Sequence, residues 1–376
     1  MTSKQRMLAA LSRQQPDRLP VTTHHVMRYF LDKYLGGADA DEFFRHFGMD
    51  AYRWSVPILG QPGVSWMGEF GFLESSSWRI NRQAVNGGSF PGYRYEIATP
   101  KGTLSMVVET NIHTDWVTER PIKNKKDIDF LAEFMPVQTC DRAEVKRQAD
   151  ELGQRGLMRG HIPTFDLYGQ PGCWQDAACL FGIENLILAT FDDPQWVHEL
   201  LGILQRRKLA YIGSLDGAAY DLLELGGGDA SSTVISPKLF DQFVAPYDRI
   251  LIQAAHAAGQ RIVYHTCGGM MPLLERIAEM GPDAVETLTP TAMGGDVRLA
   301  EVKRRIGERV CLIGGFDQFH FFIGTTPEET RAEVRRCFYE AGAGGGYILS
   351  PSDHFFDADP ELIAAYAEEA RACRYS

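Results

Sequence analysis

The second half of the chain alternates short apolar runs with longer segments in which apolar and polar positions follow a helical period. The apolar runs fit buried strands, which we predict at residues 221–225, 261–265, 284–286, 310–313 and 347–349. The longer segments predict helices at residues 237–258, 270–280, 297–306, 326–342 and 358–372. Strands that alternate with helices of this length are typical of parallel βαβ units.

The first half of the chain leaves room for three earlier units of the same kind. It predicts a strand at 19–21, a helix at 26–35 that closes at Gly36-Gly37, and a further strand at 157–163. This pattern favours an α/β fold, a (β/α)8 TIM barrel in which residues 1–376 form a single domain. A doubly wound open sheet is the competing architecture, but no glycine-rich dinucleotide fingerprint follows the first predicted strand.

Residues 50–120 depart from the βα rhythm and are rich in aromatic residues and glycine. Residues 93–97 and 104–110 each alternate apolar and polar positions, and the turn-forming segment Thr99-Pro-Lys-Gly102 separates them. We therefore predict a β-hairpin inserted in the N-terminal third of the barrel. Such an insertion would either roof a pocket or serve as a structural flap.

Composition and charge narrow the class of protein. The net charge of −11 disfavours nucleic acid as the main partner, because phosphate binding requires a basic surface. The chain contains no apolar run near the ~20 residues that span a bilayer, and its start lacks the apolar core of a signal peptide. We expect a soluble cytoplasmic protein without a membrane partner. Its seven cysteines form no disulfide-like framework, so we expect them to be reduced, with one or two free to serve as metal ligands.

Ionisable side chains gather where the predicted strands end. In a (β/α)8 barrel all these ends lie at one mouth, where active sites of this fold are built. Any one of these residues is also compatible with ordinary turn geometry, but their convergence favours an enzyme. The residues concerned are His24, His25, Glu224, Asp229, His265, Cys267, Glu286, Asp317, Asp353 and His354.

His265 and Cys267 lie two positions apart at the end of one predicted strand. Side chains at this spacing point the same way on an extended chain. An imidazole nitrogen and a thiolate sulfur suit a borderline-soft ion such as zinc. The alternative is a hydrogen-bonded core histidine beside a small buried cysteine.

The C-terminal half resembles the uroporphyrinogen decarboxylase superfamily, which also contains zinc-dependent methyltransferases that act with corrinoid proteins. The resemblance covers roughly residues 160–372 and implies a single-domain (β/α)8 barrel, commonly as a homodimer. Its motifs are Gly169-Gln-Pro-Gly-Cys-Trp, Ile235-Ser-Pro237, His265-Thr-Cys267-Gly268, Gly314-Gly-Phe-Asp317 and Gly345-Gly-Tyr-Ile-Leu-Ser-Pro351.

The resemblance separates two branches of this superfamily. The decarboxylase branch carries an arginine-rich loop after the first strand, whereas this chain has Thr22-Thr-His-His-Val-Met-Arg28, with a single arginine. The methyltransferase branch binds zinc through His-x-Cys and a later cysteine, and His265 and Cys267 match the first two. The third position falls on Asp353, where no cysteine lies nearby. Zinc accepts carboxylate oxygen and imidazole nitrogen, so Asp353 or His354 would complete the site, with Glu224 and Glu286 as further candidates.

The resemblance thus implies a zinc-dependent methyltransferase that moves a methyl group from a small-molecule donor, such as a methoxylated aromatic compound, to a corrinoid protein. A metal-independent decarboxylase of a carboxylated substrate and a non-catalytic binding barrel are the alternatives. For catalysis we assign Glu224, Asp317, His24 and His25. For substrate binding we assign Glu286, Asp229, His320 and Phe355.

Overall fold

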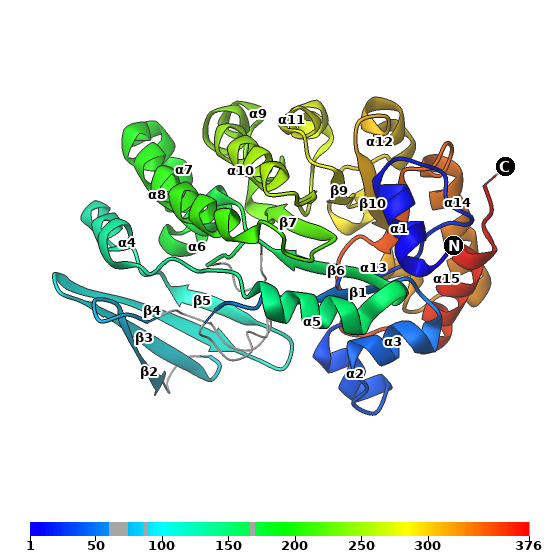
Figure 1. Cartoon of the computed structure of the whole chain (residues 1–376), viewed down its shortest axis with the longest axis horizontal. Coiled ribbons are helices and arrows are strands. Elements are labelled where there is room, and N and C mark those ends of the chain that lie inside the picture. The colour runs from blue at the N-terminus through cyan, green and yellow to red at the C-terminus, as the bar shows by residue number, and fades with distance from the viewer. Residues whose placement is uncertain (60–73, 86–88, 166–169, 376) are drawn as a thin grey trace.

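The computed structural model describes residues 1–59, 74–85, 89–165 and 170–375. Its centre is a curled parallel sheet with helices packed around it (Figure 1). The seven strands follow the chain order and are β1 (Ala51–Trp54), β6 (Gly156–His161), β7 (Leu222–Gly226), β8 (Ile262–His265), β9 (Ala284–Thr287), β10 (Cys311–Phe316) and β11 (Tyr347–Pro351). The α/β class and the parallel sheet predicted from the sequence are therefore confirmed.

The helices precede, connect and follow these strands. Those of the N-terminal part are α1 (Ser3–Leu11), α2 (Arg28–Tyr34), α3 (Ala40–Phe47), α4 (Ile128–Phe134) and α5 (Arg142–Leu152). Between β6 and β7 lie α6 (Cys173–Phe181), α7 (Ile183–Asp192) and α8 (Pro194–Ile212). The remaining helices are α9 (Pro237–Leu239), α10 (Ala245–Ala257), α11 (Leu274–Met280), α12 (Leu299–Ile306), α13 (Gln318–Phe321), α14 (Pro327–Ala341) and α15 (Pro360–Ala372).

The strands from β6 to β11 form where the sequence predicts them because both of their faces are covered. Every residue of these strands is buried. Strands that are buried on both faces typically have sequences of nearly continuous apolar residues. Local signals set the helix ends. At α14, for example, the Thr326 side chain accepts a hydrogen bond from the Glu329 backbone in a capping box, and Pro327 occupies the first turn.

The prediction of a first strand at residues 19–21 is wrong, because this segment does not form a full strand. The structure has a single parallel bridge there, between Val21 and Leu349 of β11. On the other side, the Asp50 backbone nitrogen donates to the Val21 carbonyl oxygen at 2.8 Å. This short segment thus connects the two edges of the parallel sheet. The adjacent edge strand β1 lies in a stretch for which the sequence predicted no barrel strand.

Four strands between residues 79 and 119 form a second, antiparallel sheet beside the first (Figure 1). It contains β2 (Arg79–Val85), β3 (Gly92–Thr99), β4 (Gly102–Thr110) and β5 (Asp115–Glu119), in this order. Strands β3 and β4 pair across the Thr99–Gly102 turn. The sequence therefore predicted one hairpin where the chain builds a four-stranded sheet, with its own small core of Tyr95, Met106 and Val108. Among the described residues, no helix is long and apolar enough to cross a membrane.

A buried carboxyl under β8 provides a pH-dependent prediction for the fold. Asp248 of α10 is 1% exposed and accepts a hydrogen bond from the Tyr264 hydroxyl at 2.9 Å. Burial raises the pKa of Asp248 from 3.8 to about 6, although the Tyr264 hydrogen bond lowers it. A raised carboxyl pKa stabilises the fold below pH 4, and this contribution is lost as the pH rises towards 6.

We expect the wild-type free energy of unfolding to fall relative to that of Asp248→Asn between pH 4 and pH 6, and the difference to stay constant above pH 6. The relative change approaches about 3 kcal/mol, from about two units of pKa shift at ~1.4 kcal/mol each. Urea unfolding of both proteins from pH 4 to 7.5 measures it. Two stability curves that run parallel over this range would contradict the assignment.

Candidate active site

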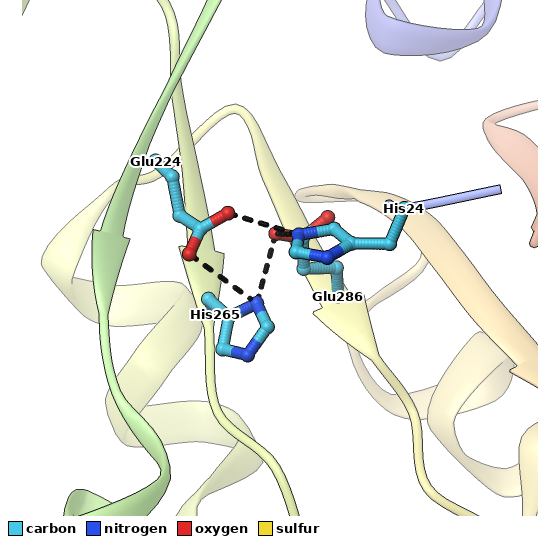
Figure 2. Close-up of side chains that lie close together, drawn as sticks. All are labelled: His24, Glu224, His265 and Glu286. Atoms are coloured by element: carbon cyan, nitrogen blue, oxygen red, sulfur yellow. Dashed lines mark hydrogen bonds and ion pairs between the residues drawn. The ribbon is translucent and has the colours of Figure 1, made fainter. Parts of the chain in front are cut away.

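Four buried side chains meet at the carboxyl ends of the central strands (Figure 2). Glu224 comes from β7, His265 from β8 and Glu286 from β9, while His24 follows the short segment at Val21. One possible ligand atom from each lies within 4.8 Å of those of the others. The prediction that strand-end residues far apart in the sequence converge is confirmed for these four.

Strand register explains the meeting. His265 stands directly opposite Glu286 on β9 and Gly226 on β7. Gly226 has a φ of +107°, and a Cβ atom built there would lie 2.3 Å from the His265 carbonyl oxygen. Only glycine combines this backbone conformation with so close an approach. It lets β7 come close enough to β8 for Glu224 and His265 to interact.

Glu286 Oε1 is the centre of the hydrogen-bond network. His265 Nδ1 lies 3.1 Å from it and His24 Nε2 lies 3.2 Å from it, and Arg159 Nη2 donates to it as well. Glu224 Oε2 accepts a hydrogen bond from Arg159 Nη2 at 3.0 Å. His24 Nε2 also lies 3.0 Å from this oxygen. Burial raises the pKa of Glu286. The positive charge of Arg159 and the contact with His24 outweigh burial, so the pKa lies well below its ordinary value. Glu286 is therefore a carboxylate.

Arg159 is the functional residue that the sequence analysis missed. It lies within β6, its side chain is 0% exposed, and its guanidinium carbon stands 4.3 Å from the centre of the Trp54 ring and 4.9 Å from that of Tyr52. An arginine is almost never fully buried unless it is paired. A lone arginine in a predicted buried strand, residues 157–163, was thus a usable signal that this strand faces an acidic partner.

His265 points its two ring nitrogens at different partners. Nδ1 faces the carboxylates of Glu286 and Glu224, at 3.1 and 3.5 Å, and Nε2 lies 3.0 Å from Cys267 Sγ. Burial lowers the pKa of His265, but Cys267 and Glu224 outweigh burial and raise it well above its ordinary value. Burial raises the pKa of the Cys267 thiol, although His265 opposes this. The side chains of the predicted His265/Cys267 pair thus contact each other at the end of β8.

Asp353 and His354 follow β11 at the same end of the sheet. Asp353 Oδ1 accepts from the His354 backbone at 2.7 Å and lies 2.8 Å from His354 Nδ1. Burial raises the pKa of Asp353, but the His354 hydrogen bond outweighs it, and the nearby His265 also lowers this pKa. The negative charge of Asp353 in turn raises the pKa of Cys267. Asp353 is therefore close enough to interact electrostatically with both members of the His265/Cys267 pair.

The remaining predicted residues have other surroundings. The His25 ring packs against His24 and Trp54, and burial holds its pKa well below the ordinary value. Asp317 caps α13, and its carboxylate pairs with the exposed His320 at 2.8 Å. In the structure Asp317 therefore has the contacts of a helix N-cap residue.

Asp229 accepts a hydrogen bond from Gln175 of α6 at 3.1 Å. Phe355 is 3% exposed and packs edge-on against Phe30 and Phe322 in the core. The predicted substrate contact through Phe355 therefore needs correction, because its ring is already covered by the protein.

Imidazole nitrogen, thiolate sulfur and carboxylate oxygen are the ligand types that zinc takes, and His265, Cys267 and Asp353 offer one of each. Among the described residues, however, the group whose possible ligand atoms meet is that of His24, Glu224, His265 and Glu286, without Cys267 or Asp353. The four-residue group of His24, Glu224, His265 and Glu286 is less suited to hold an ion between its carboxylates. The guanidinium of Arg159 already donates to both glutamates and supplies their positive charge.

Comparison with known proteins places the chain in a family. The model of the uroporphyrinogen decarboxylase (URO-D) family matches residues 97–373. The chain belongs to the uroporphyrinogen decarboxylase family. The resemblance noted from the His265-Thr-Cys267 and glycine motifs is thereby confirmed at the level of the family.

Two of the relatives carry the same name. The uroporphyrinogen decarboxylase of Nocardia farcinica is 30% identical over 267 residues, 67% of this chain and 69% of that protein. Uroporphyrinogen decarboxylase of Neisseria meningitidis serogroup C is 26% identical over 217 residues, 55% of this chain and 58% of that protein. The chain thus spans between about half and two thirds of the length of the curated relatives it matches.

A solved structure supports the same architecture over nearly the whole chain. The methyltransferase from Methanosarcina mazei superposes with a TM-score of 0.67 and covers 98% of both chains at 17% sequence identity. At this identity the likeness establishes the fold alone. The family member described here therefore shares its α/β architecture with a protein named as a methyltransferase and its sequence pattern with proteins named as decarboxylases.

Proposed function

We propose that this uroporphyrinogen decarboxylase family member is a zinc-dependent methyltransferase. It moves a methyl group from a small methoxylated donor to a corrinoid protein. The observation that carries the proposal is the pair of His265 Nε2 and Cys267 Sγ, 3.0 Å apart at the end of β8. Asp353 takes the third position, and a bound zinc ion would act there as a Lewis acid towards the donor oxygen.

The surrounding residues of the chain orient His265 for a metal, because carboxylates contact its Nδ1 and its Nε2 faces Cys267. Since Cys267 and Glu224 raise the pKa of His265, a zinc ion would have to displace the proton from Nε2, while the carboxylates keep the hydrogen on Nδ1. Glu286 and Glu224 provide the carboxylates, and Arg159 donates to both. His24, whose Nε2 contacts both glutamates, is placed to pass a proton between the site and these groups.

The donor's C–O bond to the methyl group breaks with its electron pair left on oxygen. The methyl group passes to a nucleophilic corrinoid carried by a partner protein. Because the donor oxygen must then be protonated or released as an anion, a histidine beside two carboxylates supplies a useful proton relay. A cytoplasmic enzyme of one domain, 1–376, assembled as a homodimer, remains part of this proposal.

The competing proposal is a metal-independent decarboxylase, which the names of the relatives favour. Its substrate would carry a carboxylate. The segment after Val21 offers His24 and His25 where the resemblance implies an arginine-rich loop, and its single arginine, Arg28, is largely exposed and paired with Asp32. This arrangement favours the methyltransferase.

Metal removal separates the two proposals. We expect chelation with dipicolinate to abolish methyl transfer from a methoxylated aromatic donor to a reduced corrinoid protein, and stoichiometric zinc to restore it. Methyl transfer is followed by the visible spectrum of the corrinoid, and decarboxylation by release of CO2. A carboxy-lyase activity that survives chelation, without methyl transfer in the zinc-loaded protein, would favour the decarboxylase instead.

A further inference from the structure

The peptide bonds on both sides of Cys267 are hydrogen-bonded to one neighbouring turn. The Thr266 carbonyl oxygen accepts a hydrogen bond from the Thr287 hydroxyl at 3.0 Å. The Gly268 backbone nitrogen donates to the Thr289 hydroxyl at 3.3 Å. Thr287 is the last residue of β9, and Thr289 lies two positions further on. The turn at the end of β9 therefore holds the chain directly before and directly after Cys267.

The two threonine hydroxyls also bind each other. Their oxygens lie 3.2 Å apart, and both residues are buried. A hydroxyl has one hydrogen to donate, and that of Thr287 goes to the Thr266 carbonyl oxygen. The Thr289 hydroxyl therefore donates to Thr287, while its own oxygen accepts from Gly268. These bonds form one continuous chain around Cys267, and a fully satisfied buried network of this kind rigidifies the segments that it joins.

Side chains of the adjoining segments hold the chain after Cys267 as well. The Gly269 amide donates to the Thr233 hydroxyl at 2.8 Å. The next two amides, at positions 270 and 271, donate to the Asp296 carboxylate at 2.8 and 3.1 Å. All four amides of residues 268–271 are thus taken by side chains. The position of Cys267 depends on these neighbours, since it lies between β8 and the next helical turn.

The backbone between the two threonines has an unusual conformation. Thr287 has a φ of +33° and Leu288 has a φ of +56°. Residues with a side chain rarely adopt positive φ, and a β-branched residue such as threonine is a genuine outlier there. Strain of this kind persists only where the surrounding structure enforces it, and it is concentrated at functional sites.

The neighbouring strand and the core enforce this conformation. Gly314 of β10 pairs with Thr287 and has a φ of +116°. A Cβ atom built at Gly314 would lie 2.0 Å from the Thr287 carbonyl oxygen, so only glycine lets β10 approach the turn so closely. The Leu288 side chain is 0% exposed and belongs to the hydrophobic core. The turn is therefore fixed from two sides.

We infer that the strained turn at residues 287–289 positions the Cys267 thiol, with Thr287 and Thr289 as its positioning residues. Their hydroxyls fix both peptide bonds of Cys267, so that Sγ stays directed at His265 Nε2, 3.0 Å away. The inference deepens the proposed function, on which the role of the thiol as a metal ligand rests.

Thr289→Val tests this positioning, because valine keeps the shape of threonine and removes the hydroxyl that accepts from Gly268. Peptide mass spectrometry measures the rate at which iodoacetamide alkylates each cysteine of the metal-free full chain. We expect alkylation of Cys267 to become about fivefold faster, the change in an opening equilibrium that follows the loss of one hydrogen bond. Alkylation of Cys373 should not change.

Three further variants complete the comparison. Thr289→Ser keeps the hydroxyl and should retain the wild-type rate at Cys267. Thr291→Val makes the same change at an exposed threonine two positions further on and should have no effect. Thr287→Val removes the hydroxyl that holds Thr266 and should accelerate alkylation as Thr289→Val does. It also covers the case in which Thr289→Val does not fold, which circular dichroism would show.

Cobalt(II) provides a readout of the metal site itself. A thiolate bound to cobalt(II) gives a charge-transfer absorption, so titration with cobalt chloride measures metal affinity and thiolate ligation together. We expect Thr289→Val to bind cobalt(II) at least about tenfold more weakly than the wild type, because the loss of a group that orients a metal ligand typically has an effect of about 10- to 100-fold. Thr289→Ser should bind it as the wild type does.

Unchanged alkylation of Cys267 in Thr289→Val, equal acceleration in Thr291→Val, or undiminished cobalt affinity would overturn the inference. Failure of the proposed function appears differently, as a wild-type protein with neither the thiolate absorption nor methyl transfer. Alkylation alone then decides the inference. Faster alkylation in Thr289→Val would retain the positioning of Cys267 and remove its role in methyl transfer.

Discussion

Replacement of Arg159 by methionine is expected to lower the free energy of unfolding by about 3–5 kcal/mol, the usual cost of removing one partner from a buried ion pair. Methionine keeps the aliphatic part of the side chain but loses the guanidinium that stands over Trp54 and Tyr52, so the loss reports the ion pairs together with these ring contacts. Without the guanidinium, Glu224 and Glu286 face each other as two buried carboxylates that only histidines can neutralise. Urea unfolding followed by circular dichroism measures the change.

The triple variant Arg159→Met, Glu224→Gln, Glu286→Gln is the control for this prediction. It removes all three charges while the two glutamines keep the size of the glutamates, so most of the stability lost with the charge should return. The control also covers the case in which the single variant does not fold, because the triple variant should then fold. A single variant that changes stability by less than about 1 kcal/mol would show that the network is not held by this charge, since surface substitutions have effects of that size.

Cys267→Ala is expected to reduce methyl transfer by about a thousandfold. The substitution removes the sulfur ligand and leaves His265 Nε2 without its neighbour at 3.0 Å. A Lewis acid contributes several kcal/mol to the transition state, and a loss of about 4 kcal/mol corresponds to about three powers of ten in rate. Corrinoid methylation under initial-rate conditions measures the effect.

Cys373→Ala provides the matched control. This cysteine is partly buried and directly follows α15, and its removal should leave the rate of methyl transfer unchanged. Circular dichroism should show both variants folded. Full activity in a folded Cys267→Ala protein would remove the thiol from the proposed mechanism.

The fold could be predicted best where both faces of a strand are enclosed. Strands β7 to β11 are written as apolar runs, so their positions followed from the sequence. The edge of the sheet near the N-terminus was harder. The segment at Val21 makes a single bridge and owes its place to backbone hydrogen bonds with β11, while β1 contains the half-buried Arg53 and Trp54. Neither segment has the pattern of an enclosed strand.

The site was predictable to the extent that it depends on strand ends. Glu224, His265 and Glu286 stand at the carboxyl ends of neighbouring parallel strands, and the topology alone brings them together. Arg159 was missed because its role depends on the side chains opposite it, which periodicity does not reveal. Asp317 illustrates the reverse case, since an acidic residue before a short helix serves equally well as its cap.

The zinc content of the purified protein tests the central claim most directly. Elemental mass spectrometry of the wild type, with Cys267→Ala measured in parallel, would decide it after growth with sufficient zinc. The account predicts close to one zinc ion per chain in the wild type and a loss of it in the variant. A wild-type protein without zinc, or a variant that retains it fully, would contradict the assignment of His265 and Cys267 as metal ligands.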